Sequence, residues 1–334
     1  MSTPSDSRTD RPATLRYLTG DGQPQTVSVW LGPVLDHDGG LPVRELNRTD
    51  GGETLIQKFV PLDLGQRWPA VYDLLENEAR IGVRLARCYP RSYPQELVRL
   101  VGYALDVAEP YVLFAPARGE PLGNTPTDLM IDKLRLFEVS LLQGVLALAE
   151  AGVVHGRLRP AAIRWDNRAA QIGDFSHATE AGEPRVHDGE PPWAAPEQRA
   201  GAGTADPAED VWAAGAVIYQ VATGQPVPLT GRPDLSHRGA ALRHLLDGVF
   251  ASAPGARPGA GELLHRLRSG PAVPGVALDN TTAFRLGQRE FDELIERKRA
   301  SLALTGGPPA PDPAPPKPRR WWQGNAAHAV LWMG

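Results

Sequence analysis

Five short blocks, spread over residues 152–267, constrain the fold of this 334-residue chain more than any other feature. In order along the chain they read GVVHGRLRPAAIRWD, AQIGDFSHA, PPWAAPEQ, PAEDVWAAGAVIYQVATG and GARPGAGELLHRL. Any one block is a weak signal, because short motifs also occur by chance. Five blocks in one order and at one set of spacings form a strong signal, and few architectures accommodate all of them.

The pattern of apolar residues divides the chain into a β-rich first third and a helical remainder. Alternating residues around GDGQP predict a hairpin over 14–35, and strands continue over 41–60. One helix is expected over 69–87, and from about residue 125 the apolar spacing becomes helical. This order predicts an α+β protein of two lobes with a cleft between them. Further strands are expected at 97–106, 110–116, 153–154, 161–165 and 170–174, and further helices at 207–223, 239–250 and 259–268.

Two ionisable residues in the first third fall on apolar faces. In the strand ETLIQKFV, a period of two puts Lys58 on one face with Ile56 and Val60. In the first helix, Glu78 lies within an apolar stripe that includes Ile81. A buried ammonium without a partner is costly, so the two side chains could satisfy each other. Two separate surface residues are the alternative interpretation of these positions alone.

Taken together, the five blocks resemble the Ser/Thr protein kinases of bacterial type, over roughly residues 28–270. In that family they are the catalytic loop, the metal-binding DFG, the APE motif, the central helix and the closing arginine. The resemblance implies a two-lobed kinase-like fold, with a small β-rich N-lobe over 14–118 and a larger helical C-lobe over 119–270. Residues 1–13 are polar and are expected to form a disordered arm. The composition, poor in lysine and rich in arginine, alanine, glycine and proline, also favours a bacterial source.

The resemblance assigns roles by position. Lys58 matches the lysine that holds the nucleotide phosphates, and Glu78 matches its partner on the helix. Phe114 falls at the gatekeeper position, before a hinge at 115–118, and Asp174 matches the DFG aspartate that binds magnesium. ATP with Mg²⁺ is therefore the cofactor that the resemblance implies. Three further residues match structural partners, namely Glu197 and Arg257 as the buried ion pair of the large lobe and Asp210 as the residue that holds the catalytic loop.

The catalytic loop departs from the family pattern. Active kinases with this loop read His-Arg-Asp, then Lys two residues on and Asn five residues on. Here the same positions are His155, Gly156 and Arg157, followed by Arg159 and Ala162. Arg157 replaces the carboxylate that accepts the substrate proton, and a guanidinium has no acceptor. Ala162 replaces the ligand of a second magnesium ion.

Two other features of active kinases are missing. The stretch expected to be a glycine-rich phosphate loop reads DHDGGLP over residues 36–42, in which two aspartates repel phosphate and Pro42 lacks an N–H. A plain hairpin turn is the favoured interpretation of its two glycines. Between Glu180 and Glu197 there is no Ser, Thr or Tyr to phosphorylate, and Gly156 removes the arginine that would bind such a phosphate.

A second replacement accompanies that of the catalytic aspartate. In active kinases this aspartate and a threonine of the segment before the APE motif hydrogen-bond to each other. Here the two positions are Arg157 and Glu190. We hypothesise that an ion pair has replaced the polar contact and closes the substrate site. Two unrelated exposed charges are the alternative.

These substitutions predict a pseudokinase with weak or no phosphoryl transfer, which acts as a regulatory or binding module for a protein partner. No catalytic residue is then intact, since Arg157 occupies the loop position with His155 and Glu190 nearby. The alternative is an active ATP- and Mg-dependent Ser/Thr protein kinase with an unusual catalytic loop. It is favoured by the survival of Lys58 and Asp174, because positioning and charge stabilisation supply much of the catalysis in this class.

Composition limits the location and the partners. A net charge of -4 and a pI near 6.1 argue against nucleic acid as a partner. The single cysteine, Cys88, excludes an intramolecular disulfide and suits a reducing cytosol. The N-terminus has no apolar signal-peptide core, and no run of about 18 apolar residues spans a membrane. We therefore expect a cytoplasmic protein.

The C-terminal part carries two open questions. The extension over 271–305 contains a predicted amphipathic helix at 284–304, which either packs on its own domain or docks a partner. Residues 306–334 form a Pro-rich linker and a tail with Arg319-Arg320 and Trp321-Trp322. Arginine with tryptophan is typical of membrane interfaces, so peripheral membrane contact is one interpretation of the tail. A frayed end is the favoured one.

Overall fold

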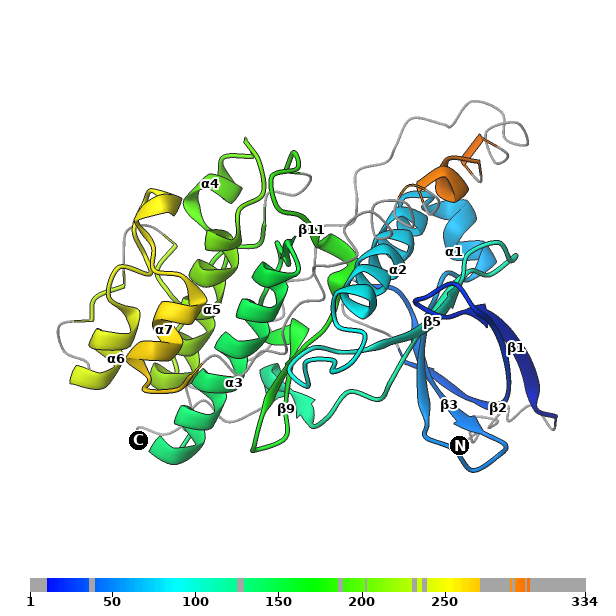
Figure 1. The fold of residues 1–334 in the computed structure, drawn as a ribbon, viewed down its shortest axis with the longest axis horizontal. Helices are drawn as coiled ribbons and strands as arrows, with labels where there is room; N and C mark the ends of the chain where they lie inside the picture. The colour runs from blue at the N-terminus through cyan, green and yellow to red at the C-terminus, as the bar shows by residue number, and fades with distance from the viewer. Residues whose placement is uncertain are drawn as a thin grey trace, which may run out of the picture.

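The computed structural model has two lobes, one rich in strands and one helical (Figure 1). The described residues are 11–35, 40–124, 129–185, 189–201, 203–229, 233–235, 239–270, 289, 292–297 and 299–300. The β-rich lobe comes from the first third of the chain, and the helical lobe follows it. The α+β architecture agrees with the expectation from the apolar pattern.

Six strands of the smaller lobe close into a barrel in the order β1-β2-β3-β4-β6-β5. The predicted hairpin is present as β1 and β2, which pair in antiparallel register from Ala13 opposite Val29 to Leu18 opposite Pro24. Leu18 also pairs with Tyr103 of β5, and this closure was not predicted from the sequence. The strands are β1 (Ala13–Leu18), β2 (Pro24–Leu35), β3 (Val43–Arg48), β4 (Leu55–Phe59), β5 (Leu100–Ala104) and β6 (Tyr111–Phe114).

Two helices pack on this barrel, α1 (Leu62–Arg67) and α2 (Ala70–Cys88). The sequence predicted α2 almost to its ends but not the short α1. Residues of α2 enter two different cores, because Leu75 packs with the barrel whereas Leu85 packs with the helical lobe. Helix α2 therefore joins the two lobes.

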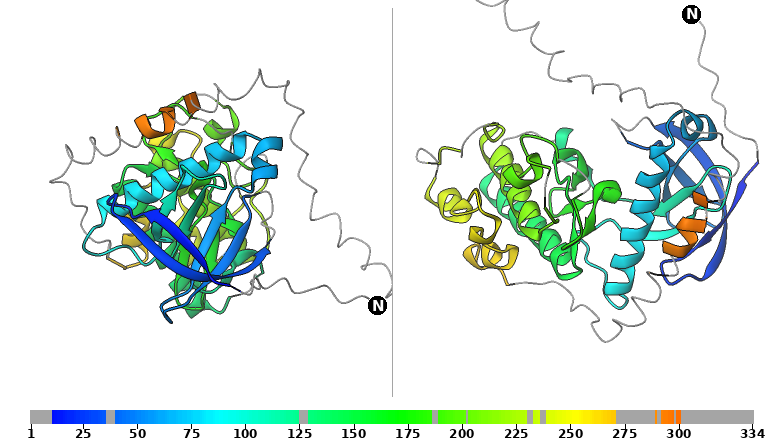
Figure 2. Two further views of the ribbon diagram at one scale, coloured as in Figure 1. Left: turned by 90° about the vertical axis from the view of Figure 1, so that its right-hand side faces the viewer. Right: turned by 90° about the horizontal axis from the view of Figure 1, so that it is seen from above.

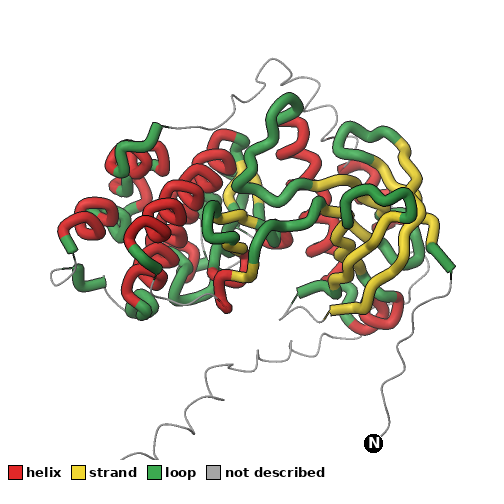
Figure 3. Tube along the Cα trace, turned by 90° about the horizontal axis from the view of Figure 1, so that it is seen from below, coloured by secondary structure: helices red, strands yellow, loops and turns green. Residues whose placement is uncertain are grey.

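The larger lobe is built around α3 (Ile131–Glu150) and α5 (Pro207–Thr223), and Figure 3 shows its helices separated from the strands of the smaller lobe. Asp206 caps the start of α5 and Gly224 ends it in the left-handed region, so the predicted span of 207–223 is confirmed. The other helices are α4 (Pro196–Arg199), α6 (Ala240–Leu246) and α7 (Ala260–Arg266). The short strands are β7 (Glu120–Pro121), β8 (Val153–Val154), β9 (Ile163–Trp165), β10 (Ala170–Ile172) and β11 (Thr179–Glu180).

Part of the predicted C-terminal helix is described. Residues 292–297 and 299–300 are helical, and they lie beside α2 on the smaller lobe (Figure 2). Phe284 and Phe291 of its predicted stripe, like the tail at 306–334, lie outside the described residues. Within the part of the chain that the structure describes, no helix is both long and apolar enough to cross a membrane.

Candidate functional site

Lys58 lies at the centre of a buried polar cluster between the lobes. It comes from β4, and its Nζ is 2.5 Å from Oε2 of Glu78 on α2 and 3.0 Å from Oδ1 of Asp174. The side chains of Lys58 and Glu78 are only 9% and 2% exposed. The contact predicted from the two apolar faces is therefore present, with Asp174 as a third member.

The protonation states of this cluster follow from its charges. Burial alone would lower the pKa of Lys58, but the carboxylates of Asp174 and Glu78 outweigh it and raise that pKa above the ordinary value. Burial alone would raise the pKa of Asp174, but the Lys58 ammonium and the hydrogen bond from Ser176 hold it well below the usual range. Lys58 is thus cationic and Asp174 anionic.

The residues that follow Asp174 are held by α2. Asp174 adopts a left-handed backbone conformation with φ of 60°. The N–H of Phe175 donates to Oε1 of Glu78 at 3.2 Å, and Ser176 Oγ donates to Oδ1 of Asp174 at 2.9 Å. The Phe175 ring is fully buried and lies 5.7 Å from the ring of His155. The segment therefore points its aspartate toward Lys58 and its phenylalanine into the core.

The positions that the resemblance assigns to the gatekeeper and the hinge lie at the end of β6 and directly after it. Phe114 is buried at the end of β6, opposite Ile56 of β4. The hinge at 115–118 is tied down at both ends, because Ala115 N–H donates to Arg99 O and Arg118 N–H donates to Gln171 Oε1. Of the expected phosphate-loop stretch, residues 36–39 lie outside the described residues. Leu41, from the same stretch, is buried with Phe114 in the barrel core.

The catalytic loop is anchored by a buried carboxylate. Asp210 of α5 accepts hydrogen bonds from the N–H groups of His155 at 2.6 Å and Gly156 at 3.1 Å. Burial raises the pKa of Asp210 to about 7, against the effect of these two donors. Burial also lowers the pKa of His155. Its Nε2 lies 2.9 Å from Gly173 O and its Nδ1 accepts from Arg157 N–H, which fits a neutral ring protonated at Nε2.

The position of the missing catalytic aspartate is filled by an ion pair. Arg157 Nη2 lies 3.0 Å from Oε2 of Glu190, and its Nε lies 3.3 Å from the same oxygen. Arg159 Nε approaches that oxygen to 3.4 Å, and Arg157 Nη1 donates to His177 Nε2 at 2.8 Å. The side chains of Arg157 and Glu190 are 27% and 37% exposed. The hypothesised contact is present, as part of a larger basic cluster.

Little space remains within this loop. The cavity bounded by Arg157, Leu158, Glu190 and Trp193 measures about 10 Å³. A volume of that size holds about one water molecule. The side chains that replace the aspartate and the threonine therefore fill the centre of the loop.

The ion pair of the large lobe is also where the resemblance placed it. Arg257 donates to both carboxylate oxygens of Glu197 at 2.6 and 2.7 Å, and its guanidinium lies over the ring of Trp212. The Arg257 side chain is fully buried. Such bidentate geometry fixes the segment around Glu197 against α5.

Two contacts of α2 had no signal in the sequence. Asn77 donates through its amide nitrogen to the carbonyl oxygens of Ser176 at 2.9 Å and Ala178 at 2.7 Å. Arg84 forms an ion pair of 2.7 Å with Glu180 of β11, and Arg80 lies 3.6 Å from the same carboxylate. A pattern of apolar residues cannot reveal these contacts, because their partners lie about a hundred residues away.

The fold and this arrangement define the class. Two lobes joined by α2, a Lys58–Glu78–Asp174 cluster between them and an anchored loop at His155 are the features of a protein-kinase-like fold. The family model of the protein kinase domain matches residues 91–239. The match includes the catalytic loop and Asp174 but not Lys58, and it supports a protein kinase-like family for this chain. A search of the curated proteins finds no match.

Kinases generally use ATP and Mg²⁺, and the residues present fit that requirement in part. Asp174 supplies one carboxylate, and Mg²⁺ is often held by one or two carboxylates together with substrate phosphates. The position of a second ligand is the buried Ala162, which has no ligand atom in its side chain. Among the described residues no group of three or more His, Cys, Asp or Glu side chains could hold a metal ion. The site suits one metal ion on Asp174 rather than two.

Proposed function

We propose that this protein is a pseudokinase of the bacterial Ser/Thr kinase type, which acts as a regulatory or binding module in place of phosphoryl transfer. One observation carries the proposal, the contact of Arg157 with Glu190 at the position of the catalytic base. A guanidinium is protonated at all physiological pH values and has no lone pair to accept a hydroxyl proton. Arg157 therefore cannot activate a substrate hydroxyl as the aspartate of active kinases does.

A transfer assay tests this proposal. The full chain is incubated with γ-labelled ATP, Mg²⁺ and generic protein acceptors, and incorporated label is counted. We expect no label above that of a Lys58→Ala variant. Label that the wild type incorporates and Lys58→Ala does not would refute inactivity. Lys133→Ala, which changes a half-buried lysine outside the cluster, is the matched control for the loss of a positive charge.

An active kinase with an unusual loop is the second candidate. It is favoured by the cluster of Lys58, Glu78 and Asp174, which has the charges needed to hold a nucleotide. Thermal unfolding in the presence of Mg-ATP distinguishes the two candidates, because it shows whether the nucleotide binds. Ligand at a hundred times its dissociation constant raises the free energy of unfolding by about 2.7 kcal/mol. No shift at millimolar nucleotide would leave the cluster with a structural role only.

In this proposal the partner is a cytoplasmic protein. The alternative is that the C-terminal tail binds peripherally to a membrane surface. The alternative rests on Arg319-Arg320 and Trp321-Trp322 in the sequence. Co-sedimentation with anionic liposomes compares the full chain with a chain that ends at residue 305. Membrane contact predicts that only the full chain sediments with the vesicles.

A further inference from the structure

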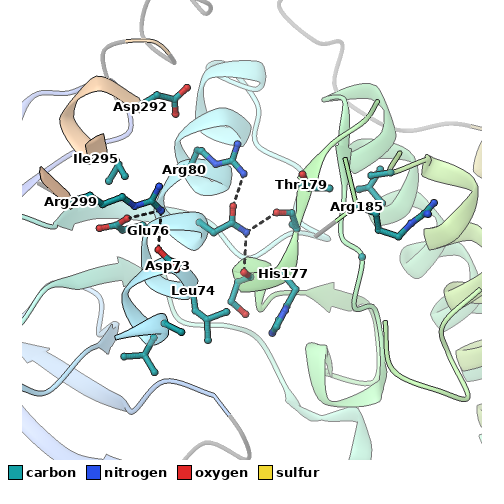
Figure 4. A pocket seen from close by; sticks show the side chains of 18 of the residues that line it. Asp73, Leu74, Glu76, Arg80, His177, Thr179, Arg185, Asp292, Ile295 and Arg299 are labelled. Atoms are coloured by element: carbon teal, nitrogen blue, oxygen red, sulfur yellow. Dashed lines mark hydrogen bonds and ion pairs between the residues drawn. The ribbon is translucent and has the colours of Figure 1, made fainter. Parts of the chain in front are cut away.

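The helical residues 292–297 and 299–300, here named the C-terminal helix, lie against the outer face of α2 (Figure 4). Ile295 is only 7% exposed and belongs to the core of the barrel lobe, together with Leu75 and Ala79 of α2. Leu294 is half-buried, whereas the other described side chains of the C-terminal helix are exposed. One apolar residue is therefore inserted into a core built from sequence more than 180 residues earlier.

An arginine fixes this contact from the side. Arg299 Nη2 lies 2.9 Å from Oδ1 of Asp73 and 3.6 Å from Oε2 of Glu76. Asp73 is exposed, but the Glu76 side chain is only 7% exposed. A buried carboxylate gains from a nearby cation because desolvation disfavours its charged form. The C-terminal helix thus supplies α2 with both an apolar and an ionic contact.

The residues that follow on α2 hold the site. Glu78 binds Lys58, and Asn77 binds the backbone of residues 175–178. They come directly after Glu76, within the same helical turn. A helix turn moves as a unit, so a displacement of α2 at Glu76 displaces both contacts.

One face of α2 at this level borders a cavity. A cavity of about 990 Å³ lies between this part of α2 and the larger lobe. Asn77 and Arg80 line it from α2, residues 176–179 line it from the segment after β10, and Ile295 and Arg299 line it from the C-terminal helix (Figure 4). Among the described residues, contact between α2 and the larger lobe at this level is therefore confined to the polar contacts of Asn77 and Glu78 and to the segment they bind.

We propose that the C-terminal helix is a strut that holds α2 in place, and through it keeps Glu78 on Lys58 and Asn77 on residues 175–178. The strut acts by Ile295 inserted into the barrel core and Arg299 paired with Asp73 and Glu76. It adds to the contacts that α2 makes with residues 175–178 beside the cavity. This role goes beyond the proposed pseudokinase function and holds whether or not the protein binds a nucleotide.

Amide hydrogen exchange on the full chain tests the strut. In an Ile295→Asp/Arg299→Glu variant we expect the peptides over 77–85 and 174–180 to exchange at least tenfold faster than in the wild type. A tenfold change corresponds to about 1.4 kcal/mol in the opening free energy. Arg297→Glu is the control for the Arg299→Glu half of the variant, since it makes that same charge change on an exposed face of the C-terminal helix, and it should leave both peptides unchanged.

Milder variants keep the test decisive if the double variant unfolds. Ile295→Ala should accelerate exchange in the same two peptides by a smaller factor, whereas Ile295→Leu should restore wild-type protection. Cys88, the single cysteine of the chain and the last residue of α2, gives a second readout through its rate of labelling by a thiol reagent. That rate should rise with exchange in 77–85.

Two outcomes would overturn the proposal. Exchange that rises only within 292–300 and at the adjacent residues 70–76 would show that the C-terminal helix rests on α2 without holding it. Unchanged exchange over 174–180 in a variant whose 77–85 peptide opens would break the link to the site.

Discussion

The two polar clusters of the site differ in burial, and this difference separates what the fold needs from what it tolerates. The Lys58–Glu78 pair is 9% and 2% exposed, whereas the Arg157–Glu190 pair is 27% and 37% exposed. Removing one partner of a buried pair leaves an uncompensated charge, which is costly. A pair that is open to solvent costs less to change. Substitution at Arg157 and Glu190 should therefore cost the fold less than substitution at Lys58 and Glu78.

This comparison gives Lys58, Glu78 and Asp174 a reason to be present that does not depend on ATP. Together they join the barrel, α2 and the segment after β10, so they contribute to the cohesion of the two lobes. Their presence alone is thus compatible with a protein that performs no chemistry. The Arg157 cluster carries the functional distinction.

Restoring the catalytic-loop residues of active kinases should produce the largest change, a gain in phosphoryl transfer. A variant with Arg157→Asp, Ala162→Asn and Glu190→Thr restores a base, a metal ligand and a neutral neighbour. A positioned general base contributes roughly 10²–10⁴-fold to rate, so label transfer from Mg-ATP should rise by about that factor. The same triple variant with Arg157→Asn is the control, because an amide cannot take the proton. Nucleotide binding without any gain in transfer would show that more than the base is missing.

Disrupting the buried cluster should destabilise the fold strongly. Lys58→Met leaves Glu78 and Asp174 without their cation, so the free energy of unfolding should fall by about 3–5 kcal/mol. Urea denaturation measures this change. Lys133→Met is the control, since Lys133 is a half-buried lysine that pairs with no carboxylate in the described residues and donates to Asn167 O. Equal stability of the two variants would contradict the assignment of the cluster to the core of the fold.

Two aspartates, Asp210 below the loop and Asp174 in the Lys58 cluster, should change the stability of the fold with pH in opposite directions. The pKa of Asp210 is raised to about 7 by burial, so the folded state binds its proton more tightly than the unfolded chain does. Its contribution to stability is full below about pH 4 and is lost as the pH rises to about 7. Asp174, whose pKa is lowered, contributes above about pH 4 and loses its contribution in acid.

The test of this contrast uses two isosteric variants in urea denaturation between about pH 2 and pH 8. Asp210→Asn should remove a loss of roughly 4 kcal/mol that the wild type undergoes as the pH rises through about three pKa units. Asp174→Asn should leave that loss intact and should flatten the acid side of the curve instead. Identical pH profiles for Asp210→Asn and the wild type would exclude Asp210 as the titrating group.

The smallest change in stability is expected at the Arg157–Glu190 pair. A double-mutant cycle with Arg157→Ala and Glu190→Ala should give a coupling energy below about 1 kcal/mol. That coupling should shrink further in molar salt, because the Debye length is then only about 3 Å. A coupling comparable to that of the Lys58 cluster would mean that the loop is as structural as the nucleotide side.

The sequence located most of these partners because the family resemblance supplies contacts between distant positions. Lys58 and Asp174 are 116 residues apart, and no local pattern joins them. Local periodicity sufficed for α2 and α5, whose apolar stripes face a core. It could not reveal the closure of the barrel by Leu18, because pairing of strand edges depends on tertiary arrangement.

The C-terminal helix illustrates the same limit. An amphipathic stripe shows that one face of a helix will be buried, but it does not show against what. Packing on its own domain is the commoner case, and the sequence alone did not choose between it and docking on a partner. The structure places Ile295 in the chain's own barrel core. The ion pair of Arg299 with Asp73 could not be anticipated either, since both side chains are largely exposed and many such pairs are compatible with the sequence.

Gly156 adds an evolutionary consequence to the altered loop. Its φ of 70° lies in the left-handed region, and a Cβ at this position would come within 3.1 Å of the carbonyl oxygen of His177. A side chain here would cost about 1–2 kcal/mol in backbone conformation alone. A return to the arginine of active kinases would therefore be penalised at its first step, before any phosphate-binding advantage is gained. Single substitutions that would restore the loop sequence of active kinases are therefore disfavoured.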